Sequence, residues 1–284
     1  MDPELCRGMT EERCREDDLT AKRVGEEFRS RFSNQNKAPD ENERERLLQR
    51  VSHTGTLNVL VLLTEFSDHE GRLERAPIED FETLFNAPAD ETDDDLIETG
   101  SVRRYFELSS YGAITINAYI NDWTVTDNTE EFYSQFGDRG RGTGTQNAML
   151  TSLNQMQDEG FDFSTLDGDG NNSVDLTILF HSSYDGIIGE DDGFGTPSEN
   201  RIASHARSSA QDLNWIANDG TIIGAYVVAS AYRGLRNNGI ARLGVLVHEM
   251  LHPFGLVDLY DRDVALTSNS GLGGLGNYDI MVRA

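Results

Sequence analysis

The chain has 284 residues, which suits one large domain or two modest ones and allows a core of useful size. Acidic residues outnumber basic ones by 50 to 24, so the net charge is −26 and the pI is near 4.4. This charge argues against a nucleic-acid partner, because phosphate would be repelled, and fits a solvated surface, calcium sites or a saline habitat. No run of about 18 apolar residues occurs, so no membrane span is predicted.

Residues 1–55 are polar, charged and permissive of helix, and a folded domain is predicted over residues 56–284. Either a prosegment that covers a cleft or a flexible leader fits the first segment. Its first residues lack the apolar core of a signal peptide. Cys6 and Cys14, the two cysteines of the chain, could close a small loop in an oxidising compartment or stay free thiols.

Strands and helices alternate in the first half of the folded domain. The run LNVLVLLTEF is apolar and rich in β-branched residues, which predicts a buried strand over residues 57–66. Two helices are predicted next, at residues 77–86 and 101–112, and Ser101 caps the second while Gly112 stops it. The segments that follow are an alternating strand (113–125), a mobile glycine-rich loop (137–145) and a further helix (146–160).

Two more strands and one apolar helix are predicted in the second half. The segment VDLTILFH predicts a central strand at residues 174–181, and TIIGAYVVASAY predicts another at residues 221–232. Between them runs a long acidic, glycine-rich loop, residues 182–200. The apolar run at residues 239–250 predicts a buried helix, and little regular structure is expected after it. This order of elements predicts an α/β domain with a mixed sheet.

Oxygen-bearing side chains alternate in the loop LDGDGNNSVDL, residues 166–176. Such oxygens on a tight loop with glycines can converge on a hard cation, as in the first nine positions of a calcium loop. Ile178 stands where that loop has its bidentate Glu, and the strand that follows argues against an EF-hand domain. We therefore predict a structural calcium loop, with a turn that bonds its own backbone as the alternative. The expected ligands are Asp167, Asp169, Asn171, the Ser173 carbonyl and Asp175.

The most informative motif is HEMLH, in which His248 and His252 stand four residues apart and Glu249 follows the first of them. Four residues are about one helical turn, so both imidazoles leave the same face of a helix and can hold a zinc ion. Glu249 lies about 100° round the helix, where it can reach a water at the metal rather than the metal itself. The motif therefore predicts metal-assisted hydrolysis of peptide bonds, whereas a buried helix with two satisfied histidines is the alternative.

The residues after this motif supply a third ligand. Gly255 can end the helix in a left-handed conformation, after which the chain turns back and Asp258 can approach the metal. Two His and one carboxylate leave a fourth position open for water, as catalytic zinc requires. Asp261 and Asp263 are also near in sequence, and Asp258 could cap a loop instead.

The segments HEMLHPFGLVDLYD (248–261) and GLGNYDIM (274–281) resemble the immune inhibitor A family of zinc metallopeptidases, which is similar in plan to the metzincins. The resemblance implies a metzincin-like catalytic domain with a mixed twisted sheet, an active-site helix and a Met-containing turn. Met281 would form the hydrophobic base beneath the metal, and Tyr278 stands where the family has an aromatic residue. Pro253 departs from the family pattern and is expected to disfavour helical geometry at its neighbour, the second histidine.

The same resemblance implies protein or peptide substrates, an extracellular location and synthesis as a zymogen, with residues 1–55 as the prosegment. Relatives generally continue further, so the C-terminal part of the domain is expected to be truncated at Ala284. The favoured function is a zinc-dependent endopeptidase with Glu249 as general base and Zn²⁺ on His248, His252 and Asp258. A non-catalytic metal-binding protein and an amidase acting on non-peptide amides are the alternatives.

Overall fold

The computed structural model describes residues 54–69, 76–88, 95–190, 192, 195–207, 213, 215–235, 239–259 and 279–281. All of them belong to the second of two units into which the chain divides, Gln49–Ala284. Residues 1–53 of the predicted leader, with Cys6 and Cys14, lie outside the described residues, as do Asp261, Asp263 and Tyr278. Gly55, the last residue of that predicted segment, instead opens the first strand of the folded domain.

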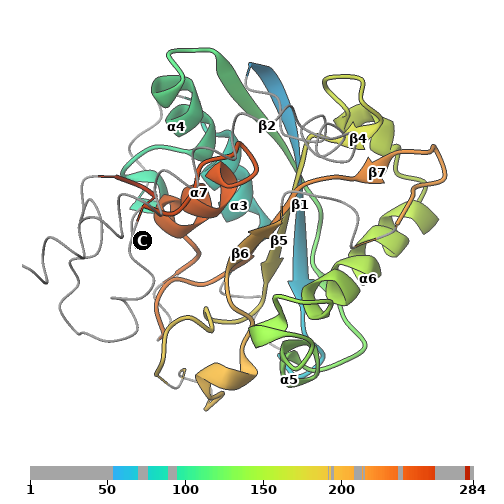
Figure 1. Ribbon diagram of the computed structural model, residues 1–284, viewed down its shortest axis with the longest axis vertical. Helices are drawn as coiled ribbons and strands as arrows, with labels where there is room; N and C mark the ends of the chain where they lie inside the picture. Colours follow the sequence, from blue (N-terminus) through green and yellow to red (C-terminus); the bar gives the residue numbers. More distant parts are fainter. Residues whose placement is uncertain are drawn as a thin grey trace, which may run out of the picture. The chain divides into compact units, whose positions relative to one another are not determined.

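Helices and strands alternate along the described chain (Figure 1). The α-helices are α3 (Ile78–Asn86), α4 (Val102–Ser109), α5 (Glu130–Ser134), α6 (Gly144–Asp158) and α7 (Leu243–Leu251). The strands are β1 (Gly55–Glu65), β2 (Ile114–Ile120), β3 (Thr124–Val125), β4 (Ser173–Val174), β5 (Leu176–His181), β6 (His205–Arg207), β7 (Ile222–Ile223) and β8 (Tyr226–Ser230). Short 3₁₀-helices are η3 (Asp95–Ile97), η4 (Asp138–Gly140), η5 (Phe163–Leu166) and η6 (Ser198–Asn200).

The main sheet has the strand order β2-β1-β5-β8-β6, and β3 also pairs with β1. All its pairings are parallel except the last, because β6 runs antiparallel to β8. The predicted α/β class with a mixed sheet is therefore confirmed. β4 and β7 form a second, two-stranded parallel sheet.

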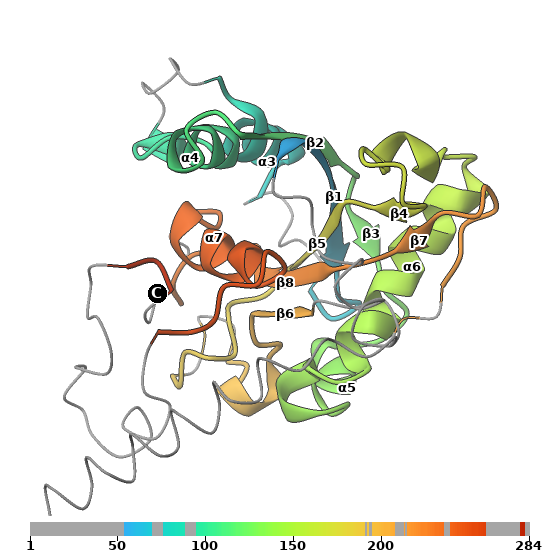
Figure 2. The same ribbon diagram turned by 45° about the horizontal axis from the view of Figure 1, so that its top comes forward.

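Helices cover both faces of the main sheet (Figure 2). In β1, Val59, Val61 and Leu63 pack in one cluster with side chains of α3, α4 and α7. Leu60 and Leu62, which alternate with them, pack on the other face against α6. Both sets are fully buried, which explains why β1 is a continuous apolar run rather than an alternating one.

Three segments that were each predicted as one strand form two strands in the structure. The segment 113–125 forms β2 and β3, because the Asp122 carboxylate accepts the N–H of Trp123 at 2.7 Å and turns the chain between them. Asp175 separates β4 from β5, where its N–H bonds to the Leu166 carbonyl. Gly224 separates β7 from β8 at a close approach, since a Cβ there would lie 2.5 Å from Ser173 Oγ.

The segment predicted as a mobile glycine-rich loop, residues 137–145, contains helical structure at both ends. The segment forms η4 and the first turn of α6, which begins at Gly144 rather than at residue 146. A Cβ on Gly144 would lie 1.9 Å from the Tyr133 carbonyl oxygen, and one on Gly142 would lie 2.6 Å from the Phe136 carbonyl oxygen. These two glycines therefore permit close packing against α5 and the residues that follow it.

Two elements were not expected from the sequence. The five-residue helix α5 is capped by Thr129, whose hydroxyl accepts the N–H of Phe132, and the run TEE was the available signal. β6 has only three residues and no apolar alternation, so its pairing with β8 is what makes it a strand. Among the described residues, no helix is long and apolar enough to cross a membrane.

Candidate functional site

The predicted active-site helix is α7, Leu243–Leu251, which follows β8 in the chain. Leu246, Val247 and Met250 are buried against the sheet, so packing fixes which face of the helix carries the motif. Gly255 has a φ of +93°, and Leu256 N–H bonds back to the Leu251 carbonyl at 3.2 Å. This ending confirms the left-handed glycine and turns the chain back beneath the helix.

The expectation that Pro253 disfavours helical geometry at His252 is wrong. His252 has φ −61° and ψ −46°, which are helical values. The helix ends at this point, so the donor that Pro253 lacks is not needed to continue it. The pose of His252 is therefore compatible with the motif.

His248, His252 and Asp258 converge on one point. Asp258 Oδ1 lies 3.2 Å from His248 Nε2 and 3.3 Å from His252 Nε2. Ligand atoms at about 2.0–2.1 Å from a tetrahedral zinc stand roughly 3.3 Å from one another, so the spacing fits that ion. The three side chains are one of two groups in the described chain that could hold a metal ion.

Backbone carbonyls orient both imidazoles. His248 Nδ1 donates to the Ile280 carbonyl at 2.9 Å, and His252 Nδ1 donates to the Leu256 carbonyl at 2.9 Å. A carbonyl can only accept, so each Nδ1 carries the proton and each Nε2 keeps its lone pair for a metal. The two rings stand 89° apart with their centroids separated by 5.0 Å.

Glu249 lies beside this group rather than in it. Its Oε2 is 4.0 Å from His252 Nε2, and the side chain is only 10% exposed. Burial raises the pKa of Glu249 to about 7, with further upward contributions from the charges of Asp185 and Asp258 and a downward one from Arg141. A carboxyl group with this pKa can both take up and release a proton near neutral pH.

Asp185 and Arg141 are the charged neighbours of Glu249 that sequence reasoning missed. Asp185 follows β5 at the carboxyl end of the sheet, where its carboxylate accepts bonds from the Ile187 N–H and from the Ser204 N–H and hydroxyl. Arg141 follows η4, and its guanidinium donates to Asp138 at 2.9 Å. The position of Asp185 directly after a central parallel strand could have indicated a functional residue, because such sites lie at the carboxyl ends of parallel strands. No local sequence pattern indicated Arg141.

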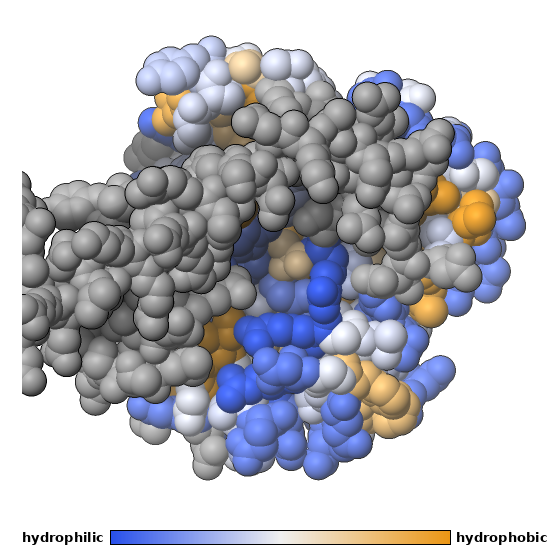
Figure 3. All heavy atoms as spheres, in the orientation of Figure 1, coloured by the Kyte–Doolittle hydropathy of each residue, from blue (hydrophilic) through white to orange (hydrophobic). Residues whose placement is uncertain are grey.

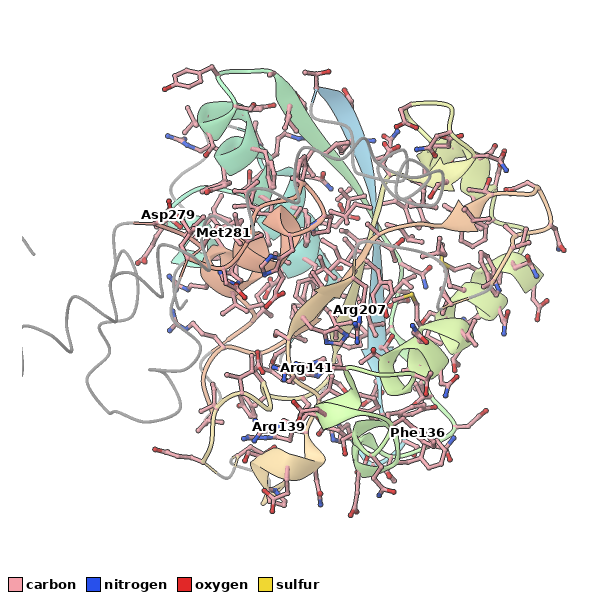
Figure 4. All side chains as sticks on the ribbon, viewed as in Figure 1. Phe136, Arg139, Arg141, Arg207, Asp279 and Met281 are labelled. Atoms are coloured by element: carbon pink, nitrogen blue, oxygen red, sulfur yellow. The ribbon has the colours of Figure 1, made fainter. Side chains whose placement is uncertain are left out.

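Met281 lies in the turn that packs near α7, as labelled in Figure 4. It is 1% exposed, its carbonyl accepts the Leu259 N–H at 2.9 Å, and its own N–H donates to Asp279 at 2.8 Å. Its neighbour Ile280 supplies the carbonyl that holds His248. The turn therefore fixes both the chain after the third ligand and the first histidine.

The other described histidines do not join this group. His69, His181 and His205 are all buried, and burial lowers the pKa of His181 to about 3 and that of His205 to about 4. His69 Nδ1 lies 2.6 Å from the Ser182 carbonyl.

The second group that could hold a metal ion is in the predicted calcium loop. Carboxylate oxygens of Asp167, Asp169 and Asp175 lie within 4.8 Å of one another. Burial, followed by smaller contributions from the two neighbouring carboxylates, raises the pKa of Asp175, although N–H bonds from Asn58 and Gly168 oppose the rise. The loop also bonds its own backbone, since Asp167 accepts three of its N–H groups, so both sequence interpretations keep support.

Asn171 and Ser173 have local contacts in this loop. The Asn171 side-chain oxygen accepts the Ser173 N–H at 2.8 Å, and Ser173 opens β4. The structure therefore places both residues on the loop without testing them as ligands.

Comparison with known proteins adds a family to this geometry. The immune inhibitor A peptidase M6 catalytic domain matches residues 49–272, a range that contains His248, Glu249, His252 and Asp258. No curated protein matches the chain in a sequence comparison. Because the matched range covers most of the 284 residues, the chain belongs to the immune inhibitor A family of M6 peptidases.

Proposed function

We propose that the protein is a zinc-dependent endopeptidase with a metzincin-like active site. The observation that carries the proposal is the convergence of two histidine Nε2 atoms on Asp258 Oδ1, at 3.2 and 3.3 Å, with each imidazole held by a carbonyl. These donors fit zinc in number, chemistry and spacing. Zinc bound there would supply a Lewis acid that acidifies a water molecule and polarises a substrate carbonyl.

Glu249 performs the proton transfers in this proposal. Its carboxylate accepts the proton of the attacking water and then passes it to the leaving amine as the peptide bond breaks. Burial limits exchange of this proton with bulk water. The turn that contains the buried Met281 orients His248 through the Ile280 carbonyl.

The edge strand β6 favours an extended peptide over a small amide as substrate. In the part of the chain that the structure describes, β6 pairs with β8 and has no strand on its other side. An open edge can add an extended segment through main-chain hydrogen bonds. The amidase alternative uses the same metal site and has no comparable observation in its favour.

Metal removal tests the proposal. We expect the full chain to contain about one zinc ion at the histidine site and to cleave casein. Phenanthroline should remove the ion and the activity, and added zinc should restore both, whereas added calcium should not. Zinc measured by mass spectrometry, together with peptide release, checks this. Bound zinc without chelator-sensitive cleavage, in the full chain and after limited trypsin treatment to remove a prosegment, would favour the non-catalytic alternative.

We also propose that the loop of residues 166–176 holds a structural calcium ion. Three carboxylates within 4.8 Å of one another repel, and a divalent cation relieves that repulsion. Asp175 connects the loop to the core, because its carboxylate accepts the N–H of Asn58 in β1 at 2.8 Å. Calcium would therefore stabilise the attachment of the loop to β1 as well as the loop itself.

Replacing Asp169 with Asn tests whether the loop is a calcium site or a turn that only bonds its own backbone. Asp169 is exposed and accepts one bond, from the Asn171 N–H at 3.1 Å, which the Asn side chain can also accept. We expect calcium to raise the melting temperature of the wild type by roughly 2–4 °C and to raise that of Asp169→Asn much less. Calorimetry with calcium, with magnesium and with neither checks this. The matched control is Asp162→Asn, outside the cluster, and an equal calcium response in Asp169→Asn would favour the self-bonded turn.

A further inference from the structure

Three arginines, Arg139, Arg141 and Arg207, lie close together on one face of the domain. Arg139 lies in η4, Arg141 follows it, and Arg207 ends β6 (Figure 4). Figure 3, in the same orientation, shows strongly hydrophilic side chains across this part of the surface. All three arginines are half-buried, and the hydrolytic steps proposed above use none of them.

Hydrogen bonds to backbone carbonyl groups hold two of these arginine side chains in place. The Arg207 guanidinium donates to the Arg141 carbonyl, and the Arg139 guanidinium donates to the Gly186 carbonyl. The Arg139 carbonyl in turn accepts the Ala203 N–H at 3.1 Å. The η4 turn is thereby tied both to β6 and to the segment that carries Asp185.

Two of these guanidinium groups lie around the same imidazole. The charges of Arg207 and Arg141 both oppose protonation of His205, and burial, the largest cause, lowers the pKa of His205 to about 4. His205 is therefore neutral near pH 7 and adds no charge of its own. The positive charge of Arg141 also lowers the pKa of Glu249, so Arg141 is the arginine of this group that interacts with the proposed general base.

The arginine charges are only partly balanced by the described residues. Arg141 pairs with Asp138, whose side chain is 75% exposed, and such a surface pair is easily exchanged. The guanidinium groups of Arg139 and Arg207 donate hydrogen bonds to uncharged carbonyl groups. Asp185, the other nearby carboxylate, is held by Ile187 and Ser204 rather than by an arginine. The arginines thus form a locally positive surface near the proposed active site, although the chain as a whole has a net charge of −26.

We propose that Arg141 and Arg207 form a subsite that binds a carboxylate of the substrate close to the scissile bond. This inference rests on the proposed peptidase function and names the substrate chemistry that the site prefers. A guanidinium presents two parallel N–H donors to the two oxygens of a carboxylate, which neither an amide nor a hydroxyl matches. The carboxylate can come from an Asp or Glu side chain or from the C-terminus of a peptide.

Matched peptides test the subsite. Peptides that differ only in Asp against Asn, moved through each position from three residues before to three after the scissile bond, measure the side-chain source. The same peptides with a free or an amidated C-terminus measure the terminal source. We expect the wild type to prefer the carboxylate form at one position by about tenfold in kcat/KM, and Arg141→Gln and Arg207→Gln to reduce that preference to about twofold or less.

The control is Arg242→Gln, because Arg242 forms an ion pair with Glu98 and its side chain is 35% exposed, as that of Arg141 is. It should keep the wild-type preference for the carboxylate form and should cleave neutral peptides as the wild type does. An unchanged preference in Arg141→Gln and Arg207→Gln, or no preference in the wild type, overturns the subsite.

Failure of the proposed peptidase function would be recognised separately. In that case the wild type cleaves none of the peptides, and binding of the Asp and Asn peptides to Glu249→Gln is measured by fluorescence instead. Tighter binding of the Asp peptide that is lost on adding Arg141→Gln supports the subsite without turnover. Equal binding of the two peptides overturns it.

Discussion

Replacing Glu249 with Gln is expected to lower kcat/KM for peptide cleavage by roughly 10³-fold while the fold and the bound metal are kept. Glu249 Oε2 stands 4.0 Å from His252 Nε2, and its carboxyl is outside the group of three ligand atoms. Gln has the same shape but cannot accept and release the proton. Peptide release and metal content, measured on the same sample, check this result.

The folded state should tolerate the Gln side chain. Burial disfavours the charged carboxylate of Glu249, as its raised pKa of about 7 shows, so a neutral side chain of equal size costs little. The free energy of unfolding of the variant should equal or slightly exceed that of the wild type. Glu159→Gln, at an exposed position after α6, is the matched control and should keep full activity. Near-normal cleavage by Glu249→Gln would remove Glu249 from the mechanism.

Replacing Asp258 with Asn is expected to weaken metal binding by about 100-fold or more and to abolish cleavage at limiting metal. The substitution keeps the shape of the side chain but removes the charge that faces His248 Nε2 and His252 Nε2. A neutral amide oxygen is a weaker ligand for zinc than a carboxylate oxygen. Titration of the metal-free protein with zinc in a competing chelator measures the loss.

Asp261→Asn and Asp263→Asn are the controls, because the sequence alone offered these two residues as rival ligands. Both should bind zinc as the wild type does. Normal zinc affinity in Asp258→Asn together with a loss in either control would assign the third ligand to the other residue. Excess zinc should partly restore peptide cleavage by Asp258→Asn, whereas it should not restore cleavage by Glu249→Gln.

The sequence predicted the elements whose signals are local. The apolar run of β1, the Ser101 cap of α4 and the left-handed Gly255 after α7 all appear in the structure. Each depends on burial or backbone conformation within a few neighbouring residues. Sequence reasoning did not find β6, or the splits at Asp175 and Gly224, because those depend on which distant strand pairs there.

The sequence by itself determined the chemistry of the candidate site, since the spacing of His248, Glu249, His252 and Asp258 is set by one helix and the turn after it. Only the tertiary structure decided which nitrogen of His248 is available, because the Ile280 carbonyl that accepts from its Nδ1 lies 32 residues away. The tertiary structure alone also brought the charges of Asp185, which follows β5, and of Arg141, which follows η4, within range of Glu249. Bond angles within one turn fix local spacing, whereas charges from distant segments meet only when the sheet and its helices pack.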